Sequence, residues 1–326
     1  MTKILVTGAS GFIGSAFVRY LLLNNYDKSY TIRALTRNTN QRNMRRLFDY
    51  KSIQSAESNG RLQIINGDLL GDLSDICEGC DWVVNFAAKT FVDHSIRDSL
   101  PFIETNIFGT YKLLEDAKRN KVKRFLQVST DEVYGAILQG AYTEDSRINP
   151  TNPYSASKAG ADALAISYSH TYGLHTTVTR TENNYGIYQH PQKALPVFVK
   201  FANEGKPLPV YGDGLHSRQW LWVDDHVSGI LTLLQKQDLA PGEVFHIAGS
   251  QELTNLELAK RILKYCNKPE TQIEFVPDHN IRPGHDRRYA LVCDKLKNLG
   301  WSPKVSLDVG LAEAVSWYSE NTWWSK

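Results

Sequence analysis

The feature that most constrains this chain is the glycine-rich turn GASGFIG at residues 8–14. It follows the apolar run KILVT and precedes the apolar stretch SAFVRYLLL, an order that predicts a strand, a tight turn and a helix. In such a unit Gly8 permits the turn, Gly11 lets the backbone approach a pyrophosphate, and Gly14 lets the helix pack on the strand. The helix start also favours an anion. The turn therefore predicts a dinucleotide-binding unit, with a plain strand–helix turn as the alternative.

The first half of the chain continues this alternation of strand-like and helix-like segments. Short apolar runs typical of buried parallel strands are separated by stretches with helical spacing, such as residues 102–119. This order predicts an α/β fold with a doubly wound parallel, Rossmann-type sheet and helices on both faces. The further runs are YTIRALT, RLQIING, WVVNFAA, RFLQVST and TTVTR.

The second half has a different composition, which predicts a second lobe. From about residue 181 the alternation gives way to Gly, Pro, Asn and aromatic residues, although LWVDDHVSGILTLLQ and VFHIAG again fit the sheet domain. We expect residues 1–180 with about 221–249 to form the dinucleotide-binding domain. Residues 181–220 and 250–326 then form a smaller C-terminal, substrate-binding lobe.

Composition and charge exclude several classes of protein. A net charge of +2 over 326 residues gives no electrostatic basis for binding nucleic acid or an anionic membrane surface. No apolar run approaches the length of a membrane span, and the glycine-rich turn begins too early for a signal peptide, so we expect a cytoplasmic protein. Cys77 and Cys80 form a Cys-x-x-Cys, but without a second pair or a histidine cluster we expect a turn and no metal site.

The second predicted strand leaves the choice of cofactor open. NAD-binding sheets normally carry an acid near the end of this strand, which holds the ribose 2′-hydroxyl. Here TIRALTRNTNQR contains no acid, and Arg33, Arg37 and Arg42 are candidates to meet the 2′-phosphate of NADP. Idle, exposed arginines are the alternative. We expect Arg42, Arg45 and Arg46 together to lie on a solvated helix face or against a phosphate.

Tyr154 and Lys158 in PYSASK are the first candidate catalytic pair. Because they are four residues apart, they share one face of a helix. A tyrosine that removes an alcohol proton at neutral pH needs its pKa lowered by about three units, roughly 4 kcal/mol. A nearby ammonium and a positive nicotinamide ring provide such stabilisation. After a dinucleotide turn, and some twenty residues past Ser129 and Thr130, the pair predicts hydride transfer at a carbinol carbon.

An acid pair, Asp131 and Glu132, follows the strand-like run in VSTDEVYG. Alcohol oxidation needs only the tyrosine, the lysine and a hydroxyl such as Thr130, so the two carboxylates are additional. Held beside a transient ketone, a base and an acid permit elimination of water across the neighbouring carbons. Successive residues leaving a strand point in different directions, so one acid can reach a C5 proton and the other a C6 hydroxyl. A helix-capping carboxylate with a solvated neighbour is the alternative.

Five motifs in a fixed order make a family resemblance specific: VSTDEVYG, NPYSASKAG, RTENNYGIYQHPQKALP, VYGDGLHSRQWLWVDDH and RPGHDRRYA. Together with VDHSIRDSLPFIETNIFGTYKLLE and GWSPKVSLDVGLAEAVSWY, they resemble the dTDP-glucose 4,6-dehydratase family over nearly the whole chain. The resemblance implies a tightly bound and recycled NAD, a nucleotide-sugar substrate that is most simply a dTDP-hexose, and a homodimer.

By this resemblance, Tyr154 takes the C4 hydroxyl proton of the sugar while hydride passes from C4 to the nicotinamide. Thr130 hydrogen-bonds the C4 oxygen, and Lys158 holds the tyrosine and the ribose. Glu132 then removes the C5 proton and Asp131 protonates the departing C6 hydroxyl, before hydride returns to C6 and a proton to C5. The implied product is a 4-keto-6-deoxy sugar.

The resemblance also assigns binding residues. Arginine suits the diphosphate because its fork donates two hydrogen bonds at once. The implied substrate residues are Lys89, Phe91, Glu182, Asn183, Asn184, Lys193, Leu195, Pro209, Tyr211, Arg218, Arg282 and His285. The implied cofactor residues are Gly8, Gly11, Phe12, Ile13, Gly14, Arg37, Asp68, Leu69, Ala87, Ala88, Tyr154 and Lys158.

Three departures from the family pattern concern the sugar pocket. Lys89 and Phe91 stand where the family commonly has an acid and an imidazole. Glu182 replaces a serine, and Gln219 replaces an aspartate. We hypothesise that Lys89 and Glu182 pair with each other near the sugar. If these residues line the pocket, the substrate need not be dTDP-glucose.

Two other functions stand as alternatives. A related epimerase or decarboxylase acting on another nucleotide hexose needs no acid for a leaving hydroxyl, so the Thr-Asp-Glu run argues against it. A non-catalytic dinucleotide sensor would not need Tyr154, Lys158 and the acid pair together. Helices at 102–119 and 158–172 carry small and apolar residues, in keeping with the implied dimer, whereas Trp323 and Trp324 pack on the second lobe or serve an interface.

Overall fold

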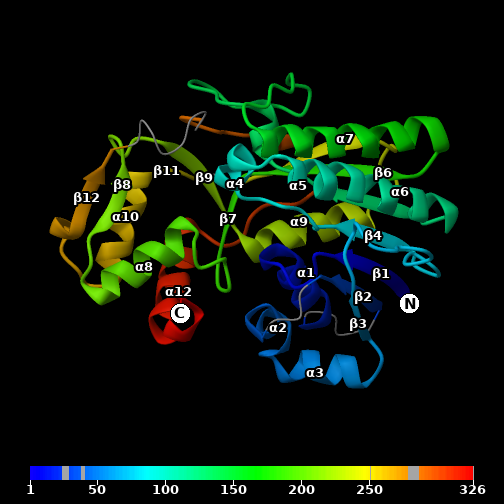
Figure 1. The fold of residues 1–326 in the computed structure, drawn as a ribbon, viewed down its shortest axis with the longest axis horizontal. Coiled ribbons are helices and arrows are strands. Elements are labelled where there is room, and N and C mark those ends of the chain that lie inside the picture. The colour runs from blue at the N-terminus through cyan, green and yellow to red at the C-terminus, as the bar shows by residue number, and fades with distance from the viewer. Residues whose placement is uncertain (24–28, 38–40, 250, 278–285, 326) are drawn as a thin grey trace.

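The computed structural model describes residues 1–23, 29–37, 41–249, 251–277 and 286–325, which form a larger and a smaller lobe (Figure 1). Within these residues, seven parallel strands build the sheet of the larger lobe in the order β10-β6-β5-β4-β1-β2-β3. The chain winds in opposite directions on the two sides of β1, so a crevice is expected at the carboxyl ends of β1 and β4. The strands are β1 (Thr2–Thr7), β2 (Tyr30–Thr36), β3 (Leu62–Asn66), β4 (Trp82–Asn85), β5 (Arg124–Val128), β6 (Thr176–Thr181) and β10 (Glu243–Ile247).

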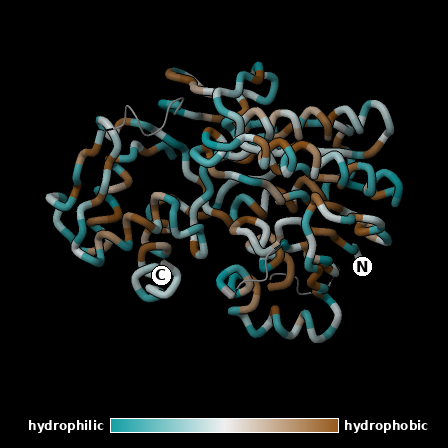
Figure 2. The backbone as a smooth tube through the Cα atoms, in the orientation of Figure 1, coloured by the Kyte–Doolittle hydropathy of each residue, from teal (hydrophilic) through white to brown (hydrophobic). Residues whose placement is uncertain are grey.

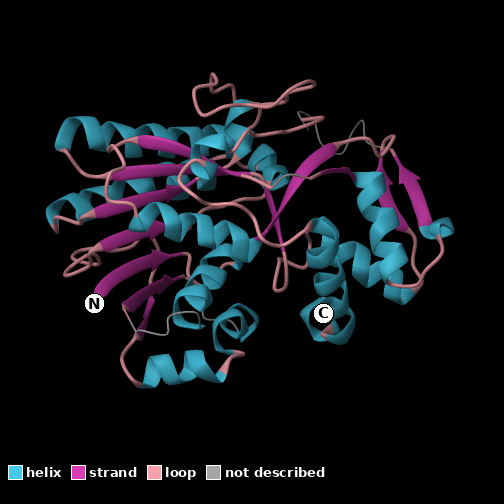
Figure 3. Ribbon diagram, turned by 180° about the vertical axis from the view of Figure 1, so that it is seen from behind, coloured by secondary structure: helices cyan, strands magenta, loops and turns pink. Residues whose placement is uncertain are grey.

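Successive side chains of β1 alternate between two apolar cores, one on each face of the sheet. Figure 3 shows helices on both faces of this sheet. Ile4 and Val6 pack with one set of helices, whereas Leu5 packs with the other. Strands buried on both faces are typical of a parallel sheet, and the predicted doubly wound fold is confirmed. The first face carries α1 (Phe12–Leu23), α2 (Gln41–Phe48), α3 (Lys51–Ser58) and α9 (Val223–Gln235). The second carries α4 (Val92–Arg97), α5 (Leu100–Phe102), η1 (Ile103–Phe108), α6 (Gly109–Arg119) and α7 (Pro153–Tyr172).

The smaller lobe has an apolar core of its own, and Figure 2 shows hydrophobic segments gathered inside it. Among the described residues it contains a three-stranded sheet, β11-β9-β7, and a two-stranded sheet, β12-β8. The division at 1–180 with 221–249, and 181–220 with 250–326, stays a prediction. The strands of the smaller lobe are β7 (Asn183–Tyr185), β8 (Leu208–Tyr211), β9 (Ser217–Trp222), β11 (Glu252–Thr254) and β12 (Ile273–Val276). The helices of the whole chain that are not yet named are η2 (Asp131–Tyr134), which follows β5, and α8 (Ala194–Glu204), α10 (Asn255–Tyr265), η3 (Glu270–Gln272), α11 (Asp294–Lys297), α12 (Leu307–Glu320) and η4 (Thr322–Ser325).

The helix predicted for residues 102–119 contains a π-helical turn, η1, between α5 and α6. Such turns often occur at functional positions. Here η1 carries the buried Asn106, whose Oδ1 accepts the Lys89 N–H at 2.8 Å and whose Nδ2 donates to the Lys89 carbonyl at 3.0 Å. The two bonds fix the segment that follows β4, beside the expected crevice.

The C-terminal tryptophans pack on the rest of the chain. Trp324 is fully buried, and its indole donates to the Gln189 carbonyl at 2.7 Å. The guanidinium carbon of Arg45 lies 4.2 Å from the centre of the Trp323 ring. Both tryptophans pack with the core of the smaller lobe, which was one of the two roles considered from the sequence. In the described ranges, no helix has the length and apolar character that crossing a membrane requires.

Candidate active site

The acid pair lies just after β5, in the short 3₁₀ turn η2. Thr130 is the N-cap of this turn, and its hydroxyl accepts the Glu132 N–H at 3.3 Å. The same hydroxyl donates to Asp131 Oδ1 at 3.1 Å. The capping group is therefore the threonine hydroxyl and not a carboxylate. Both acids remain available for chemistry.

The two carboxylates have different surroundings. Asp131 is 5% exposed, and burial followed by the charge of Glu132 raises its pKa to about 7. Glu132 is half-buried; burial raises its pKa too, but the charges of Arg218 and Lys193 oppose this. A carboxyl group with a pKa near neutrality can hold a proton at pH 7 and release it during a reaction. Asp131 is thus suited to act as an acid, and Glu132, beside two cations, as a base.

A capping box at the start of α7 positions the tyrosine and the lysine. The Asn152 side chain accepts the Ser155 N–H at 2.9 Å, and the Ser155 hydroxyl accepts the Asn152 N–H at 3.3 Å. In the first two turns of the helix, Tyr154 and Lys158 are both buried. Lys158 Nζ donates to the carbonyl of Val128, the last residue of β5, at 2.6 Å. This bond joins the helix to the strand that carries the acid pair.

Burial dominates the electrostatics of the tyrosine and the lysine. Burial and then the charge of Glu132 raise the pKa of Tyr154, while the Thr130 hydroxyl opposes this. Burial also lowers the pKa of Lys158 to about 8, against the opposing effect of Asp162. The sequence predicted a tyrosine pKa lowered towards neutrality, and the polypeptide alone has the opposite effect. The reason is that carboxylates, as well as apolar groups, surround the phenol.

The glycine-rich turn is shaped as a cradle for a dinucleotide. Gly8 has a φ of +62°, and a side chain there would come within 2.9 Å of the Ala87 nitrogen. A side chain at Gly14 would overlap the Gly8 carbonyl oxygen. The turn therefore packs directly against the end of β4, at the expected crevice. The first N–H groups of α1, from Phe12 and Ile13, have no acceptor within a helix. These residues fit an anionic pyrophosphate.

The ends of β2 and β3 carry an arginine and an aspartate. Arg37 Nη1 lies 3.7 Å from Asp68 Oδ2, and both side chains are partly exposed. Both remain candidates for the adenosine end of the cofactor. The prediction for Arg33 is wrong, because its guanidinium donates to the carbonyls of Ile76 at 2.6 Å and Glu78 at 3.2 Å. It binds the loop that precedes β4, and so it does not serve a 2′-phosphate.

The arginines of α2 do not form a uniformly solvated face. Arg45 is exposed and Arg42 is half-buried, whereas Arg46 is 4% exposed. Arg46 donates to the carbonyls of Ser10 at 3.0 Å and Tyr188 at 3.1 Å. The sequence left a solvated face and a phosphate contact open here, because it does not show that the 186–190 segment packs on this helix.

Arg218, in β9, brings positive charge to the acid pair. Its guanidinium donates to the carbonyls of Ser217 at 2.7 Å and Asp286 at 2.8 Å, and it lies 4.4 Å from the ring centre of Tyr289. Its charge lowers the pKa of both members of the acid pair. The smaller lobe therefore supplies a cation to a site whose acids belong to the larger lobe.

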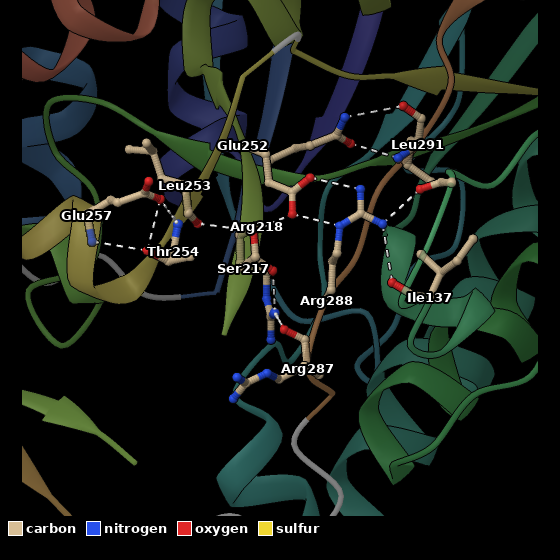
Figure 4. A network of polar contacts seen from close by, with 12 residues as sticks. Ile137, Ser217, Arg218, Glu252, Leu253, Thr254, Glu257, Arg287, Arg288 and Leu291 are labelled. Atoms are coloured by element: carbon tan, nitrogen blue, oxygen red, sulfur yellow. Dashed lines mark hydrogen bonds and ion pairs between the residues drawn. The ribbon is translucent and has the colours of Figure 1, made fainter. Parts of the chain in front are cut away.

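Arg288, next to Arg218, connects an ion pair of the smaller lobe to a loop of the larger lobe (Figure 4). Arg288 makes two bonds to the carboxylate of Glu252, at 2.7 and 2.9 Å. Its third nitrogen donates to the carbonyls of Ile137 at 3.3 Å and Gly140 at 2.8 Å, on the loop that follows η2. This arginine holds the chain segment that positions Arg218.

Aromatic and basic side chains gather near the loop after β4. The Phe91 ring lies 5.0 Å from the rings of both His94 and His190. Lys193 Nζ lies 4.7 Å from the centre of the Phe91 ring. Burial, then the charges of Arg46 and Lys193, lower the pKa of His190 to about 4. Phe91 therefore packs against two imidazoles, although it replaces the imidazole of the family pattern.

Other predicted substrate residues are placed less directly. Leu195 is fully buried in the core of the smaller lobe, so only its backbone is available to a nucleotide. The Asn184 amide nitrogen donates within the chain, to the Thr181 hydroxyl at 3.2 Å and the Glu182 carbonyl at 3.1 Å. Asn183, Pro209 and Tyr211 are half-buried. Arg282 and His285 lie outside the described residues.

The hypothesised pair between Lys89 and Glu182 does not form. Glu182 is 4% exposed, and its Oε1 accepts the Gly249 N–H. Its Oε2 is buried without a hydrogen-bond partner among the described residues. Burial raises the pKa of Glu182 well above its usual value, which favours the uncharged form of this carboxyl group. The Gln219 departure serves the fold, because its Oε1 accepts the Leu291 N–H at 2.7 Å.

Cys77 and Cys80 are buried free thiols in the turn that leads to β4. Burial raises the pKa of Cys80, which disfavours the reactive thiolate. Across the described ranges, no group of three or more histidine, cysteine or acidic side chains is arranged to hold a metal ion.

Two site residues were not singled out from the sequence. Asn152 caps α7, and the Asn-Pro pair before the tyrosine was an available signal for a helix start. Asp162 follows Lys158 by one helical turn and is fully buried in an ion pair with Arg180, at 3.0 Å. Its spacing of four residues from Lys158 was the available signal.

A family model described as GDP-mannose 4,6 dehydratase matches residues 5–314. This chain belongs to that family. The dehydratase resemblance drawn from the motifs is thereby confirmed. Among curated relatives of this family member, a dTDP-glucose 4,6-dehydratase from Streptomyces niveus is 44% identical over 99% of this chain and 94% of its own. The low-salt glycan biosynthesis protein Agl12 from Haloferax volcanii is 45% identical over 97% of this chain and 98% of its own.

Solved structures show the same fold in dehydratases and epimerases. The dehydratase DesIV from Streptomyces venezuelae, with NAD and TYD bound, superposes on this family member with a TM-score of 0.89 at 41% identity, over 99% and 98% of the chains. A UDP-glucuronic acid 4-epimerase from Bacillus cereus gives 0.88 at 31% identity, over 98% and 99%. The fold alone does not separate these activities, so the side chains of the site must.

Proposed function

We propose that the protein is an NAD-dependent nucleotide-sugar 4,6-dehydratase, a hydro-lyase that converts dTDP-glucose to dTDP-4-keto-6-deoxyglucose. The observation that supports this most is the meeting of two catalytic units. Tyr154 and Lys158 form the first, the acid pair forms the second, and the bond from Lys158 to Val128 links them. An epimerase requires only the first unit. The names of the relatives and the NAD in the solved dehydratases support the same activity.

Tyr154 is the base for the C4 hydroxyl in this proposal. The phenol is buried beside Thr130, whose hydroxyl favours the phenolate. Lys158, with a pKa of about 8, is still mainly cationic at pH 7 and stabilises negative charge near it. When bound, NAD supplies the hydride acceptor, the hydride that returns to C6, and a positive ring charge that favours the phenolate.

The acid pair carries out the elimination. A keto group at C4 acidifies the C5 hydrogen, and Glu132 removes it as a proton. Asp131, with a pKa of about 7, gives a proton to the C6 hydroxyl, which leaves as water. One proton enters the pair and one leaves it, so its net charge is the same before and after the step. Such pairing avoids charge build-up in a buried site.

Arg218 and Lys193 provide positive charge for the nucleoside diphosphate. Both lower the pKa of Glu132, so they lie near the reacting end of the substrate as well. Arg218 can present two nitrogens to a phosphate, whereas Lys193 acts as a point charge. Tyr211, half-buried in β8, is proposed to pack beside the base.

Incubation with dTDP-glucose and no added cofactor tests this function. We expect the absorbance of the 4-keto product in alkali, and we expect its loss in Tyr154→Phe. A C4 epimer without loss of water would instead identify an epimerase. No turnover of any dTDP-, UDP-, GDP- or CDP-hexose would favour a non-catalytic dinucleotide sensor.

We further infer a homodimer that works in the cytoplasm. Apolar side chains are exposed along α5, η1 and α6, and a second copy of the chain would cover them. The free thiols of Cys77 and Cys80 suit a reducing compartment. The exposed set is Leu100, Ile103, Phe108 and Tyr111.

A further inference from the structure

The buried guanidinium of Arg46 has no carboxylate partner among the described residues. It is 4% exposed, and its hydrogen bonds go to uncharged oxygens: Ser10 O at 3.0 Å, Tyr188 O at 3.1 Å and Asn43 Oδ1 at 2.8 Å. Burial lowers its pKa only to about 10, so it is charged at neutral pH. A buried charge without a counter-ion is unfavourable. The surroundings of Arg46 therefore favour an anion.

Two of these oxygens belong to loops that serve different ligands. Ser10 lies in the glycine-rich turn, which is shaped for the pyrophosphate of a dinucleotide. Tyr188 lies in the 186–190 segment between β7 and α8, a few residues before Lys193. Arg46 thus connects the cofactor cradle to the loop that leads into the proposed nucleotide contact.

The segment that Arg46 holds is strained. Tyr188 has a φ of +64°, in the left-handed region that bulky residues rarely adopt. Its phenol donates to Asp49 Oδ2 at 2.9 Å. The ring of Trp324 lies 4.9 Å from the Arg46 guanidinium, and its indole donates to the Gln189 carbonyl at 2.7 Å. Because contacts from both lobes impose this conformation, loss of one of them is expected to release it.

We propose that Arg46 is a positioning residue that takes the cofactor pyrophosphate as its counter-ion and holds the 186–190 segment against the glycine-rich turn. Dinucleotide binding and the order of the substrate loop then depend on the same side chain. A guanidinium is required because its fork reaches two carbonyls at once, while an ammonium supplies a single charge. The inference rests on the proposed function for the identity of its ligand, a dinucleotide.

The test compares Arg46→Met with Arg45→Met. Arg45 is the exposed neighbour on the same helix, so the control removes the same charge without touching Ser10 or Tyr188. We expect the dissociation constant for NAD, measured by calorimetry, to rise about tenfold in Arg46→Met and less than about twofold in the control. At saturating NAD, the KM for dTDP-glucose should rise several-fold with little change in kcat.

A third variant, Arg46→Lys, separates the effect of the positive charge from the effect of the hydrogen bonds to Ser10 and Tyr188. It should bind NAD nearly as tightly as the natural protein, but its KM for dTDP-glucose should be raised as in Arg46→Met. A purely structural defect would not raise the KM while leaving NAD affinity unchanged. If Arg46→Met fails to fold, the same split in Arg46→Lys carries the test. Equal NAD affinity in Arg46→Met and Arg45→Met, or an unchanged KM in Arg46→Lys, would overturn the proposal. The NAD arm is a direct binding measurement, so it does not depend on whether dTDP-glucose is the substrate, whereas the KM arm requires turnover of dTDP-glucose by the natural protein.

Discussion

Asp131 and Glu132 share a peptide bond, yet only Asp131 is almost completely buried. The difference arises because the Thr130 cap starts a tight turn, which directs successive side chains into different surroundings. The sequence predicted that the two acids follow a strand and have different surroundings, and both features are observed; their catalytic roles stay predictions. It did not reveal their electrostatic surroundings, since the cations that lower the pKa of Glu132, Arg218 and Lys193, come from the other lobe.

Asp131→Asn and Glu132→Gln should each retain oxidation at C4 and lose elimination. Both variants keep Tyr154 and Lys158, so reduced nicotinamide should accumulate on mixing with dTDP-glucose. We expect product formation to fall by about 10²- to 10⁴-fold, the usual effect of losing one general acid or base. Stopped-flow absorbance and product assays measure the two steps separately. Normal dehydration in either variant would contradict the assigned roles.

Asp131 also predicts a pH dependence of stability. Its pKa in the folded protein is about 7, above the usual 3.8. An acid with a raised folded-state pKa stabilises the fold when protonated, and this contribution is lost as the pH rises from about 4 to about 7. The loss amounts to at most about 4 kcal/mol.

Asp131→Asn cannot ionise, so its free energy of unfolding should exceed that of the natural protein above neutral pH. Near pH 4 the two proteins should differ much less. Urea denaturation at both pH values gives the comparison. The same difference at the two pH values would exclude ionisation of Asp131 as the cause.

At the scale of elements, periodicity predicted the strands and the catalytic helix but not their local irregularities. The run RFLQVST became β5, and the Tyr-x-x-x-Lys pair lies in α7 as expected. The π-helical turn at η1 escaped prediction because one extra residue per turn barely changes an apolar pattern. The burial of Arg46 was not predicted, because a charged residue on a helix is expected to be exposed to solvent unless its packing partner is known. The sequence therefore predicted most of the elements but did not reveal the contacts between the two lobes.

Removal of the α7 cap should reduce both stability and catalysis. In Asn152→Ala the helix loses a side-chain acceptor at its start, which costs about 1 kcal/mol. Because Tyr154 is only two residues further on, we also expect kcat to fall.

The matched control is Thr254→Ala, which removes the equivalent capping box of α10 in the smaller lobe. It should lower the melting temperature by a similar amount and leave kcat unchanged. An equal fall of kcat in both variants would mean that general destabilisation, and not the position of Tyr154, limits catalysis.

At the scale of the whole molecule, the two lobes contribute complementary chemistry. The larger lobe supplies the tyrosine, the lysine and the acids, while the smaller lobe supplies Arg218 and Lys193. Arg288 and Arg46 each donate hydrogen bonds to residues of both lobes. The site therefore depends on the spacing of the lobes as much as on either one.

Dimerisation is tested by placing a charge on the exposed apolar surface. Phe108 is 51% exposed on η1, so Phe108→Asp should keep the fold and give a monomer by light scattering. Val309→Asp is the control, because Val309 is 60% exposed on α12 in the smaller lobe. A natural protein of monomer mass, or a dimer in both variants, would refute the proposed interface.

The last strand of the large sheet, β10, has a consequence for synthesis on the ribosome. It pairs with β6 but is encoded more than sixty residues later, after the chain has traversed β7, α8, β8 and β9. Until β10 and α9 emerge, a nascent chain exposes the edge of β6 and part of the apolar face that α9 covers. Translation pauses or truncations between residues 181 and 243 should therefore yield aggregation-prone chains, whereas a stop after the sheet is complete should be better tolerated.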